Sequence, residues 1–365
     1  MNYHFEREAE LDSPSLVYYE DAIRENIRKA IGLAGGPERL WPHVKTHKMA
    51  SLVRIQLEMG ITRFKCAAIS EAEMTASCGA GDVLVAYPLV GPAIQRFIRL
   101  CARYAATRFW AIGDDLGQLT LLGKTARDSG GNVPVLIDVN LGMNRTGVSL
   151  DTLEDFYHAA AQIPGISVRG FHGYDGHLGI KDPDERKRAV AEKTDILFGI
   201  KSSLENQGFV IPVLVMGGTP TFPCHAKNPG VFLSPGTFFV QDHGYDEKYR
   251  DLTFIPGAAL LCRVVSHPAP SLFTIDAGSK AVASDPQGDR GIIAGMNGAK
   301  PVAQSEEHWV FRMESGEIPA IGTILYVIPT HICPTTALYP GAYVVEDGKL
   351  VNYWEVTARN RRLTI

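Results

Sequence analysis

The sequence predicts an α/β protein in which a TIM-type (β/α)8 barrel is followed by a C-terminal antiparallel β domain. Between about residues 15 and 245, short apolar runs rich in β-forming residues alternate with amphipathic helical patterns. Eight such runs are present, which is the number that a closed barrel of this type needs. After about residue 245 the helical patterns give way to strand-like runs separated by turn residues.

Most of the expected barrel strands end in a polar or glycine-bearing loop, and the stretches between strands carry apolar residues three and four positions apart, as amphipathic helices do. An open doubly wound sheet is the alternative. It is less well supported, because no GxGxxG follows the first strand and the composition does not change near the middle of this region. The expected strands are 40–45, 64–69, 82–87, 108–112, 134–139, 167–174, 212–217 and 231–239.

Two domains are expected from the length of 365 residues, because a single hydrophobic core rarely grows so large. The barrel domain is placed at 15–245 and the β domain at 246–365, with residues 1–14 joining the β domain. Within the β domain, Asp347-Gly348 is a dipeptide that a type I′ hairpin turn prefers.

The composition excludes several classes of protein. With a net charge of −4 and both signs spread along the chain, no basic surface for nucleic acid or an anionic membrane is expected. The N-terminus carries charges where a signal peptide needs an apolar run, and no stretch approaches the roughly 18 apolar residues of a membrane span. The six cysteines form no CxxC pairs, which predicts reduced thiols in a soluble cytoplasmic protein.

The segment PHVKTHK (42–48) places Lys45 at the C-terminal end of the first expected barrel strand, where barrel enzymes keep their active sites. A lysine amine must lose its proton to form an imine with an aldehyde, and neighbouring cations favour that loss. Lys45 therefore suits Schiff-base chemistry. A solvated basic loop is the alternative interpretation.

Two glycine-bearing segments, MGGTPT (216–221) and SPGTF (234–238), follow the seventh and eighth expected strands. Backbone N–H groups at such turns bind phosphate, and TIM-type barrels most often bind phosphate at this place. An ordinary turn explains either segment alone, but the two together predict a phosphate-bearing ligand. The candidate donors are Gly217, Gly218, Thr219, Gly236 and Thr237.

The fifth and sixth expected strands bring charged groups to the same end of the barrel. VNLGMNRTGV (139–148) places Arg145 beyond a strand end, where a guanidinium can bind a phenolate or a carboxylate. HGYDGH (172–177) offers a density of titratable groups that is unusual for a plain turn. These groups are His172, Tyr174, Asp175 and His177.

PTHICPT (329–335), in the β domain, contains a candidate metal pair. If this segment is extended, His331 and Cys333 point to one side and could reach the same ion. Sulfur beside imidazole favours Zn²⁺ over Mg²⁺ or Ca²⁺, and two protein ligands leave positions open for water or substrate. A core cysteine next to a surface histidine is the alternative interpretation.

Together these segments resemble the D-threonine aldolase and D-serine dehydratase family of fold-type III pyridoxal-phosphate enzymes, which are related to alanine racemase. The resemblance spans essentially the whole chain and includes IDAGSKAVASD and SEEHW in the β domain. It implies pyridoxal 5′-phosphate bound as an imine to Lys45, with Arg145 near the phenolic oxygen and Tyr174 near the ring. It implies phosphate contacts from Gly218, Thr219, Gly236 and Thr237, a divalent metal (Zn²⁺, or else Mn²⁺ or Mg²⁺) on His331 and Cys333, and a homodimer.

The activity that the resemblance implies is metal-assisted cleavage of D-3-hydroxy amino acids. D-threonine aldolase chemistry, which yields glycine and an aldehyde, is narrowly favoured, with His177 as the base and Lys45 as the cofactor lysine. A zinc-dependent D-serine or D-3-hydroxyaspartate dehydratase is the alternative, because cysteine at position 333 resembles the dehydratases. An amino-acid racemase and a non-catalytic pyridoxal-phosphate-binding protein are less favoured, since the metal pair argues against the first and the β domain against the second.

Overall fold

A computed structural model describes the whole chain, from Met1 to Ile365. The residues form two compact units, and each is described by itself. The sequence-based domain boundaries remain a prediction. The β unit comprises Met1–Lys29, Thr46–Ser51 and Thr237–Arg359, and the barrel unit comprises Ala30–Lys45, Leu52–Gly236 and Asn360–Ile365.

The barrel unit contains parallel strands in the order β2-β3-β4-β5-β7-β8-β9. Isolated bridges from Leu40 to Leu233 and from His43 to Lys65 place the segment 40–43 between β9 and β2. Seven strands and this segment make the eight positions of a closed barrel, so the predicted fold class is confirmed. The strands of this unit are β2 (Arg63–Cys66), β3 (Asp82–Val85), β4 (Arg108–Gly113), β5 (Val133–Asn140), β6 (Val148–Ser149), β7 (Ile166–Gly173), β8 (Val213–Met216) and β9 (Val231–Leu233).

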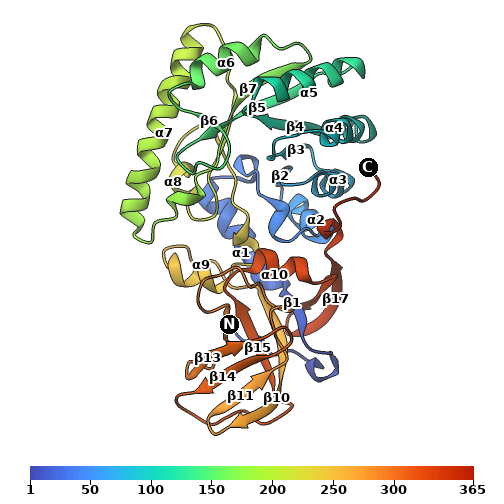
Figure 1. The fold of residues 1–365 in the computed structure, drawn as a ribbon, viewed down its shortest axis with the longest axis vertical. Coiled ribbons are helices and arrows are strands. Elements are labelled where there is room, and N and C mark those ends of the chain that lie inside the picture. The colour runs from blue at the N-terminus through green and yellow to red at the C-terminus, as the bar shows by residue number, and fades with distance from the viewer. The chain divides into compact units, whose positions relative to one another are not determined.

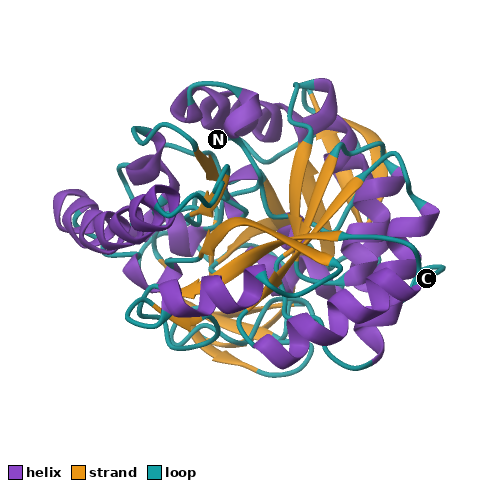
Figure 2. Ribbon diagram, turned by 90° about the horizontal axis from the view of Figure 1, so that it is seen from above, coloured by secondary structure: helices purple, strands orange, loops and turns teal.

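Helices follow the strands and pack against the outside of the parallel sheet (Figures 1 and 2). Two of them begin at the aspartates that cap them. The side chain of Asp115 accepts a hydrogen bond from the N–H of Gln118, and that of Asp182 accepts from the N–H of Glu185. None of the chain's helices is long and apolar enough to cross a membrane. The helices up to residue 226 are α1 (Glu20–Ala34), α2 (Ala50–Glu58), α3 (Ile69–Ser77), α4 (Pro92–Arg103), α5 (Leu116–Asp128), α6 (Leu153–Ala161), α7 (Pro183–Asn206) and α8 (Phe222–Ala226).

Large apolar side chains fill the interior of the barrel. The rings of Trp41 and Trp110 meet edge to face with their centroids 5.7 Å apart. The cluster contains residues from the segment 40–43 and from β3, β4, β5 and β8. These side chains therefore close the interior of the barrel below the C-terminal ends of the strands. Its buried members are Trp41, Leu84, Trp110, Ile112, Leu136, Val213 and Val215.

The β unit is built on a nine-stranded sheet in the order β13-β14-β11-β10-β1-β16-β17, with β15 pairing with both β10 and β12. Every neighbouring pair is antiparallel except β1 with β16, which is parallel, so the β domain expected to be antiparallel is a mixed one. Its elements are β1 (Ser15–Tyr19), α9 (His243–Lys248), β10 (Ala258–Ala269), β11 (Leu272–Ile275), β12 (Gly291–Ile293), β13 (Ala299–Gln304), β14 (Trp309–Met313), β15 (Ile324–Pro329), α10 (Ile332–Leu338), β16 (Gly341–Glu346) and β17 (Lys349–Glu355).

The turn between β16 and β17 is the one that the sequence predicts. Asp347 and Gly348 have φ angles of 49° and 71°, and a type I′ turn requires a positive φ at both positions. The N-terminal residues also join this sheet, since Glu6 bridges to Lys349 at the end of the same hairpin.

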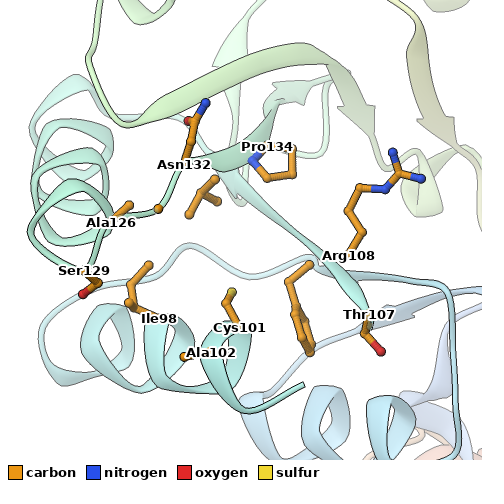
Figure 3. Close-up of a pocket in the computed structure, with 12 residues that line it drawn as sticks. Ile98, Cys101, Ala102, Thr107, Arg108, Ala126, Ser129, Asn132 and Pro134 are labelled. Atoms are coloured by element: carbon orange, nitrogen blue, oxygen red, sulfur yellow. The ribbon is translucent and has the colours of Figure 1, made fainter. Parts of the chain in front are cut away.

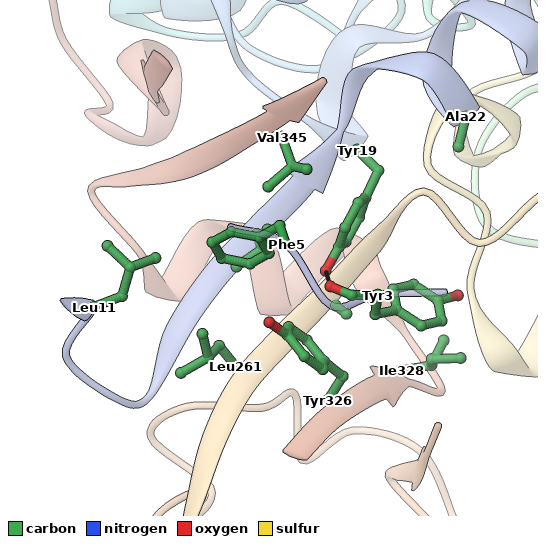
Figure 4. Close-up of a cluster of buried hydrophobic side chains, with 11 residues drawn as sticks. Tyr3, Phe5, Leu11, Tyr19, Ala22, Leu261, Tyr326, Ile328 and Val345 are labelled. Atoms are coloured by element: carbon green, nitrogen blue, oxygen red, sulfur yellow. Dashed lines mark hydrogen bonds between the residues drawn. The ribbon is translucent and has the colours of Figure 1, made fainter. Parts of the chain in front are cut away.

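An aromatic cluster anchors the N-terminal segment within the β unit (Figure 4). The hydroxyl of Tyr19 donates a hydrogen bond to the carbonyl oxygen of Tyr3 at 2.6 Å, and the two ring centroids lie 5.1 Å apart. The hydroxyl of Tyr326, on β15, donates to the Glu8 carboxylate at 2.7 Å. Each buried tyrosine hydroxyl therefore has an acceptor, and the apolar parts of the rings contribute to the core.

Candidate active site

The residues predicted for the barrel site follow the C-terminal ends of parallel strands. Lys45 lies just beyond the bridge at His43, Arg145 follows β5, Tyr174 follows β7, and Gly218 follows β8. Parallel strands end at the same edge of a sheet, so the barrel unit brings these groups to one mouth. The side chain of Lys45 is exposed, which leaves its amine accessible to a ligand.

The ring of Tyr174 has both glycine backbone and two cationic side chains close to it. Its centroid is 5.0 Å from Cζ of Arg145 and 5.6 Å from Nζ of Lys65. A Cβ atom added at Gly218 would lie 3.1 Å from Cε2 of this ring, and one at Gly176 would lie 2.2 Å from its hydroxyl. Glycine at both positions therefore permits the ring to lie where it does.

A carboxylate–imidazole pair lies beside this ring. Nδ1 of His172 is 2.7 Å from Oδ1 of Asp138, and the hydroxyl of Thr146 donates to Oδ2 of the same carboxylate at 2.7 Å. The other ring nitrogen of His172, Nε2, is buried and has no hydrogen-bond partner. Burial lowers the pKa of His172, although its hydrogen bond to Asp138 opposes this effect. The neutral ring then donates from Nδ1 and keeps a lone pair on Nε2.

A second buried pair supports the turn at 217–221. Nε2 of His225 lies 2.7 Å from Oδ2 of Asp175, whose Oδ1 accepts a hydrogen bond from the hydroxyl of Thr221 at 2.6 Å. The same hydroxyl oxygen accepts from the N–H of Gly218 at 3.0 Å. A continuous chain of hydrogen bonds therefore connects the backbone of this turn, through Thr221 and Asp175, to the buried ring of His225.

Removal of Asp175 tests this support. We expect Asp175→Ala to lower the free energy of unfolding by about 3 kcal/mol, because it leaves His225 buried without its partner. Urea denaturation followed by circular dichroism would measure the loss, with Asp195→Ala, an exposed aspartate on α7, as the matched control. Equal midpoints for the two variants would show that the pair does not stabilise the fold.

The predicted phosphate turns are already hydrogen bonded to each other. The N–H of Gly236 donates to the hydroxyl of Thr219 at 3.1 Å, and the N–H of Gly218 is engaged by Thr221. Both Thr219 and Thr237 are buried. A phosphate bound at the turns of the barrel unit would compete with existing contacts for the N–H groups of Gly218 and Gly236.

Lys65 also lies at the mouth of the barrel, but it is not among the site residues predicted from the sequence. Its side chain is only 2% exposed, and its position on β2 directs it into the barrel. Burial, and after it the charge of Lys45, lowers the pKa of Lys65 to about 7. The available signal was a single lysine inside the apolar run FKCAAI, since lysine is rarely buried without a functional or pairing reason.

His177, the predicted base, lies in the short 3-10 helix Gly176–Leu178 and is exposed. Its Nε2 atom lies 3.1 Å from the position that a Cβ on Gly142 would occupy, so the ring packs beside the loop that leads to Arg145. Compared with His172, it lacks a carboxylate that would orient it. Its role as a base remains a prediction.

The predicted metal pair lies in the β unit, with one correction. The segment 331–333 is not extended, because α10 begins at Ile332 and contains Cys333. Pro334 in the first turn is the physical reason, since proline fits the start of a helix and has no N–H to leave unpaired. His331 still forms a hydrogen bond with Cys333, so the two side chains do converge.

Further polar groups surround this pair. Nδ1 of His331 lies 2.5 Å from Oδ2 of Asp285, and Sγ of Cys333 lies 3.2 Å from Oγ1 of Thr46 and 3.7 Å from Oγ1 of Thr237. Burial alone would lower the pKa of His331, but Cys333 and Asp285 raise it to about 9. No group of three or more histidine, cysteine, aspartate and glutamate side chains is arranged to hold a metal, so water or substrate would have to complete the shell.

A separate pocket of the barrel unit lies between α4 and α5, beside the starts of β4 and β5 (Figure 3). It is mainly apolar, and burial raises the pKa of the Cys101 thiol that faces it to about 12. Because the strands begin here, the pocket is at the opposite end of the barrel from Lys45 and Arg145. Stability rather than catalysis is the usual role of this end.

The comparisons with known proteins agree with this architecture. The family model described as "Alanine racemase, N-terminal domain" matches residues 19–240, and the model described as "Putative serine dehydratase domain" matches residues 257–345. A barrel and a β unit in this order define the fold-type III, alanine racemase-like class.

Full-length relatives narrow the class. The chain is 30% identical over 359 residues to a D-threonine aldolase of Arthrobacter sp, covering 96% of this chain and 93% of the relative. It is 24% identical to a D-threo-3-hydroxyaspartate dehydratase of Delftia sp., covering 94% and 97% of the two chains. The crystal structure of D-threonine aldolase from Filomicrobium marinum superposes with a TM-score of 0.91 at 26% identity, covering 98% of both chains. The chain belongs to the alanine racemase-like fold-type III family, in its D-threonine aldolase and D-serine dehydratase-like group.

Proposed function

We propose that this chain is a pyridoxal-phosphate-dependent, metal-assisted lyase that cleaves D-3-hydroxy amino acids to glycine and an aldehyde. The observation that carries the proposal is the convergence of Lys45, Arg145 and Tyr174 at one barrel mouth in a chain that is 30% identical to a D-threonine aldolase. Other chemistry for the same mouth would have to explain an accessible lysine beside the exposed guanidinium of Arg145 and the buried amine of Lys65.

The groups at the mouth fit this cofactor. Nε2 of His172 is a buried polar atom without a partner, and Lys65 is a buried amine with no hydrogen-bond acceptor, so a ligand with polar groups would satisfy both. Lys45 would hold the aldehyde carbon covalently, and Arg145 would face the phenolic oxygen. Gly218, Thr219, Gly236 and Thr237 would hold the phosphate. When bound, the cofactor supplies an electron sink for bond cleavage at the α-carbon.

The protein's own groups then divide the remaining tasks. The amine of Lys45 would accept or return a proton at the α-carbon of the substrate. His177 is proposed to remove the proton of the substrate hydroxyl, and the fixed ring of Tyr174 limits how far a bound ring can tilt. A divalent metal on His331 and Cys333 would act as a Lewis acid toward that hydroxyl, and the sulfur ligand favours zinc.

A dehydratase is the second candidate function, and Cys333 is the observation that favours it. In that reaction Lys45 removes the α-proton and hydroxide leaves from the β-carbon, so that a keto acid and ammonia form. The 24% identical relative from Delftia sp. is named for such a reaction. The same residues serve both paths, so the bond that breaks has to be measured.

Product analysis separates the two functions. The purified protein, supplied with pyridoxal phosphate and ZnCl2 or MnCl2, is incubated with D-threonine, D-serine and D-3-hydroxyaspartate. We expect glycine and acetaldehyde from D-threonine, and at least about tenfold less ammonia than glycine. Ammonia and a keto acid as the main products would replace the aldolase assignment by the dehydratase. Only exchange of the α-proton, or conversion to the L-isomer, would indicate a racemase.

A further inference from the structure

Lys65 reaches across the axis of the barrel. It is the third residue of β2, while Tyr174 follows β7. In the ring of eight positions, three strands separate β2 from β7 on one side, and β8, β9 and the segment 40–43 separate them on the other. The two strands are therefore diametrically opposite, and the 5.6 Å between Nζ of Lys65 and the Tyr174 ring centroid places this amine in the centre of the mouth.

The nearby carboxylates do not form hydrogen bonds with this amine. Asp138 accepts from His172 and Thr146, and Asp175 pairs with His225 and Thr221. Nζ of Lys65 lies over the Tyr174 ring, and the carboxylates act on it through space rather than through a hydrogen bond. A buried lysine amine without an acceptor has lost its hydration in either protonation state, so the position is explained better by a ligand that supplies an acceptor.

Two further observations indicate what kind of ligand this is. The guanidinium of Arg145 lies 5.0 Å from the centroid of the Tyr174 ring and Nζ of Lys65 lies 5.6 Å from it, and the charge of Arg145 acts on Lys65. Beside them, Nε2 of His172 is buried and unpartnered. The two cationic side chains match an anionic oxygen, whereas the lone pair on Nε2 of His172 would accept a hydrogen bond from a donor group beside that oxygen.

We propose that Lys65 is an anion-binding residue at the bottom of the mouth and that, with Arg145, it binds the phenolate oxygen of pyridoxal phosphate. The inference rests on the proposed function. In pyridoxal phosphate, the phenolic oxygen is on the ring carbon next to the one that bears the aldehyde. A cofactor ring held by Lys45 would therefore have this oxygen close to the amine of Lys45. The phosphate is expected at the turns after β8 and β9, which leaves the phenolate as the anionic group for Lys65.

Proton uptake on binding is a consequence of this role. Besides burial, several charged groups act on the amine of Lys65. The cations Lys45 and Arg145 lower its pKa, and the anions Asp175 and Asp138 raise it. It also interacts with His172 on β7. Because burial and the charge of Lys45 lower the pKa of Lys65 to about 7, a large part of this amine is neutral at pH 8. An anion bound next to it raises its pKa, so binding at pH 8 takes up a proton, and this uptake disappears well below pH 7 because the amine is already charged.

The test uses ligands that cannot bond to Lys45. 4-Deoxypyridoxine 5′-phosphate has no aldehyde but keeps the phenolic oxygen, and its 3-deoxy analogue lacks that oxygen. Binding to the cofactor-free full chain is measured by isothermal titration calorimetry at pH 6 and pH 8, in two buffers with different ionisation enthalpies. The proteins are wild type, Lys65→Met, Lys65→Arg and the control Lys124→Met, which removes an exposed lysine on α5.

We expect Lys65→Met to weaken binding of 4-deoxypyridoxine 5′-phosphate about 10- to 100-fold and to abolish proton uptake at pH 8, with the 3-deoxy analogue unaffected. Lys65→Arg should restore most of the affinity without the proton uptake, and Lys124→Met should behave as wild type. An equal affinity of wild type and Lys65→Met, or an equal loss for both ligands, would overturn the role of Lys65. If wild type binds neither ligand, the proposed cofactor is wrong and the assignment of Lys65 is overturned with it.

Discussion

Lys45→Ala is expected to remove the visible absorbance of the protein saturated with pyridoxal phosphate and to lower D-threonine cleavage by about 1,000-fold or more. The reason is that Lys45 is exposed beyond a strand end, where its amine can reach an aldehyde, whereas Lys65 is buried. Ultraviolet–visible spectra and an assay for glycine measure the two effects.

Borohydride reduction adds an independent measurement of the same assignment. Reduction of the cofactor-saturated wild-type protein should attach a pyridoxyl group to the peptide that contains Lys45, as found by mass spectrometry. Lys181→Ala, which removes an exposed lysine of the barrel unit, serves as the control and should retain both band and label. A label on Lys65 in wild type, or a band that persists in Lys45→Ala, would move the covalent role to the other lysine.

The approximate positions of the barrel strands were predictable, because each strand is a short apolar, β-forming run that can be recognised from its own residues. Seven of the eight expected barrel runs contain a strand, although the run 231–239 extends well beyond β9. The eighth run, 40–45, is held by single bridges at Leu40 and His43 rather than by a regular ladder. The mouth residues Lys45, Arg145 and Tyr174 could be assigned for the same reason, since the end of a parallel strand fixes the end of the barrel.

The interior of the mouth was less predictable, because it depends on which residues meet across the ring. Asp138 and His172 are direct partners in the register of β5 with β7, although 34 residues separate them in the chain. Likewise, Lys65 meets Tyr174 only because β2 and β7 lie opposite each other. The alternation of residues along a strand predicts which side chains point into the barrel, but it does not predict which of them contact each other across it.

The N-terminal strand illustrates the same limit on a larger scale. Residues 15–19 are apolar and β-forming, which suits a barrel strand as well as any other, but they form β1 between β10 and β16 of the β unit. The partners of β1 lie more than 230 residues away in the chain, as in the pairing of Tyr18 with Ala258. Local sequence cannot select between two sheets that are both able to bury such a strand.

Removal of the metal is expected to stop the reaction without releasing the cofactor. Chelation with EDTA, or the substitution His331→Ala, should lower D-threonine cleavage by at least about 100-fold, because the Lewis acid that polarises the substrate hydroxyl is lost. The visible absorbance should remain, since it depends on Lys45 and not on the metal ligands. Activity assays and absorbance spectra on the same samples measure both.

Metal reconstitution makes this prediction specific to the pair. Chelated wild type should recover with ZnCl2 or MnCl2, whereas His331→Ala should not, and His308→Ala, an exposed histidine of the β unit, should behave as wild type. Because the protein supplies only His331 and Cys333, the ion should bind more tightly when a hydroxy acid such as D-lactate is present to complete its shell. Full activity after chelation would remove both residues from the mechanism and would leave the hydroxyl proton to a base such as His177.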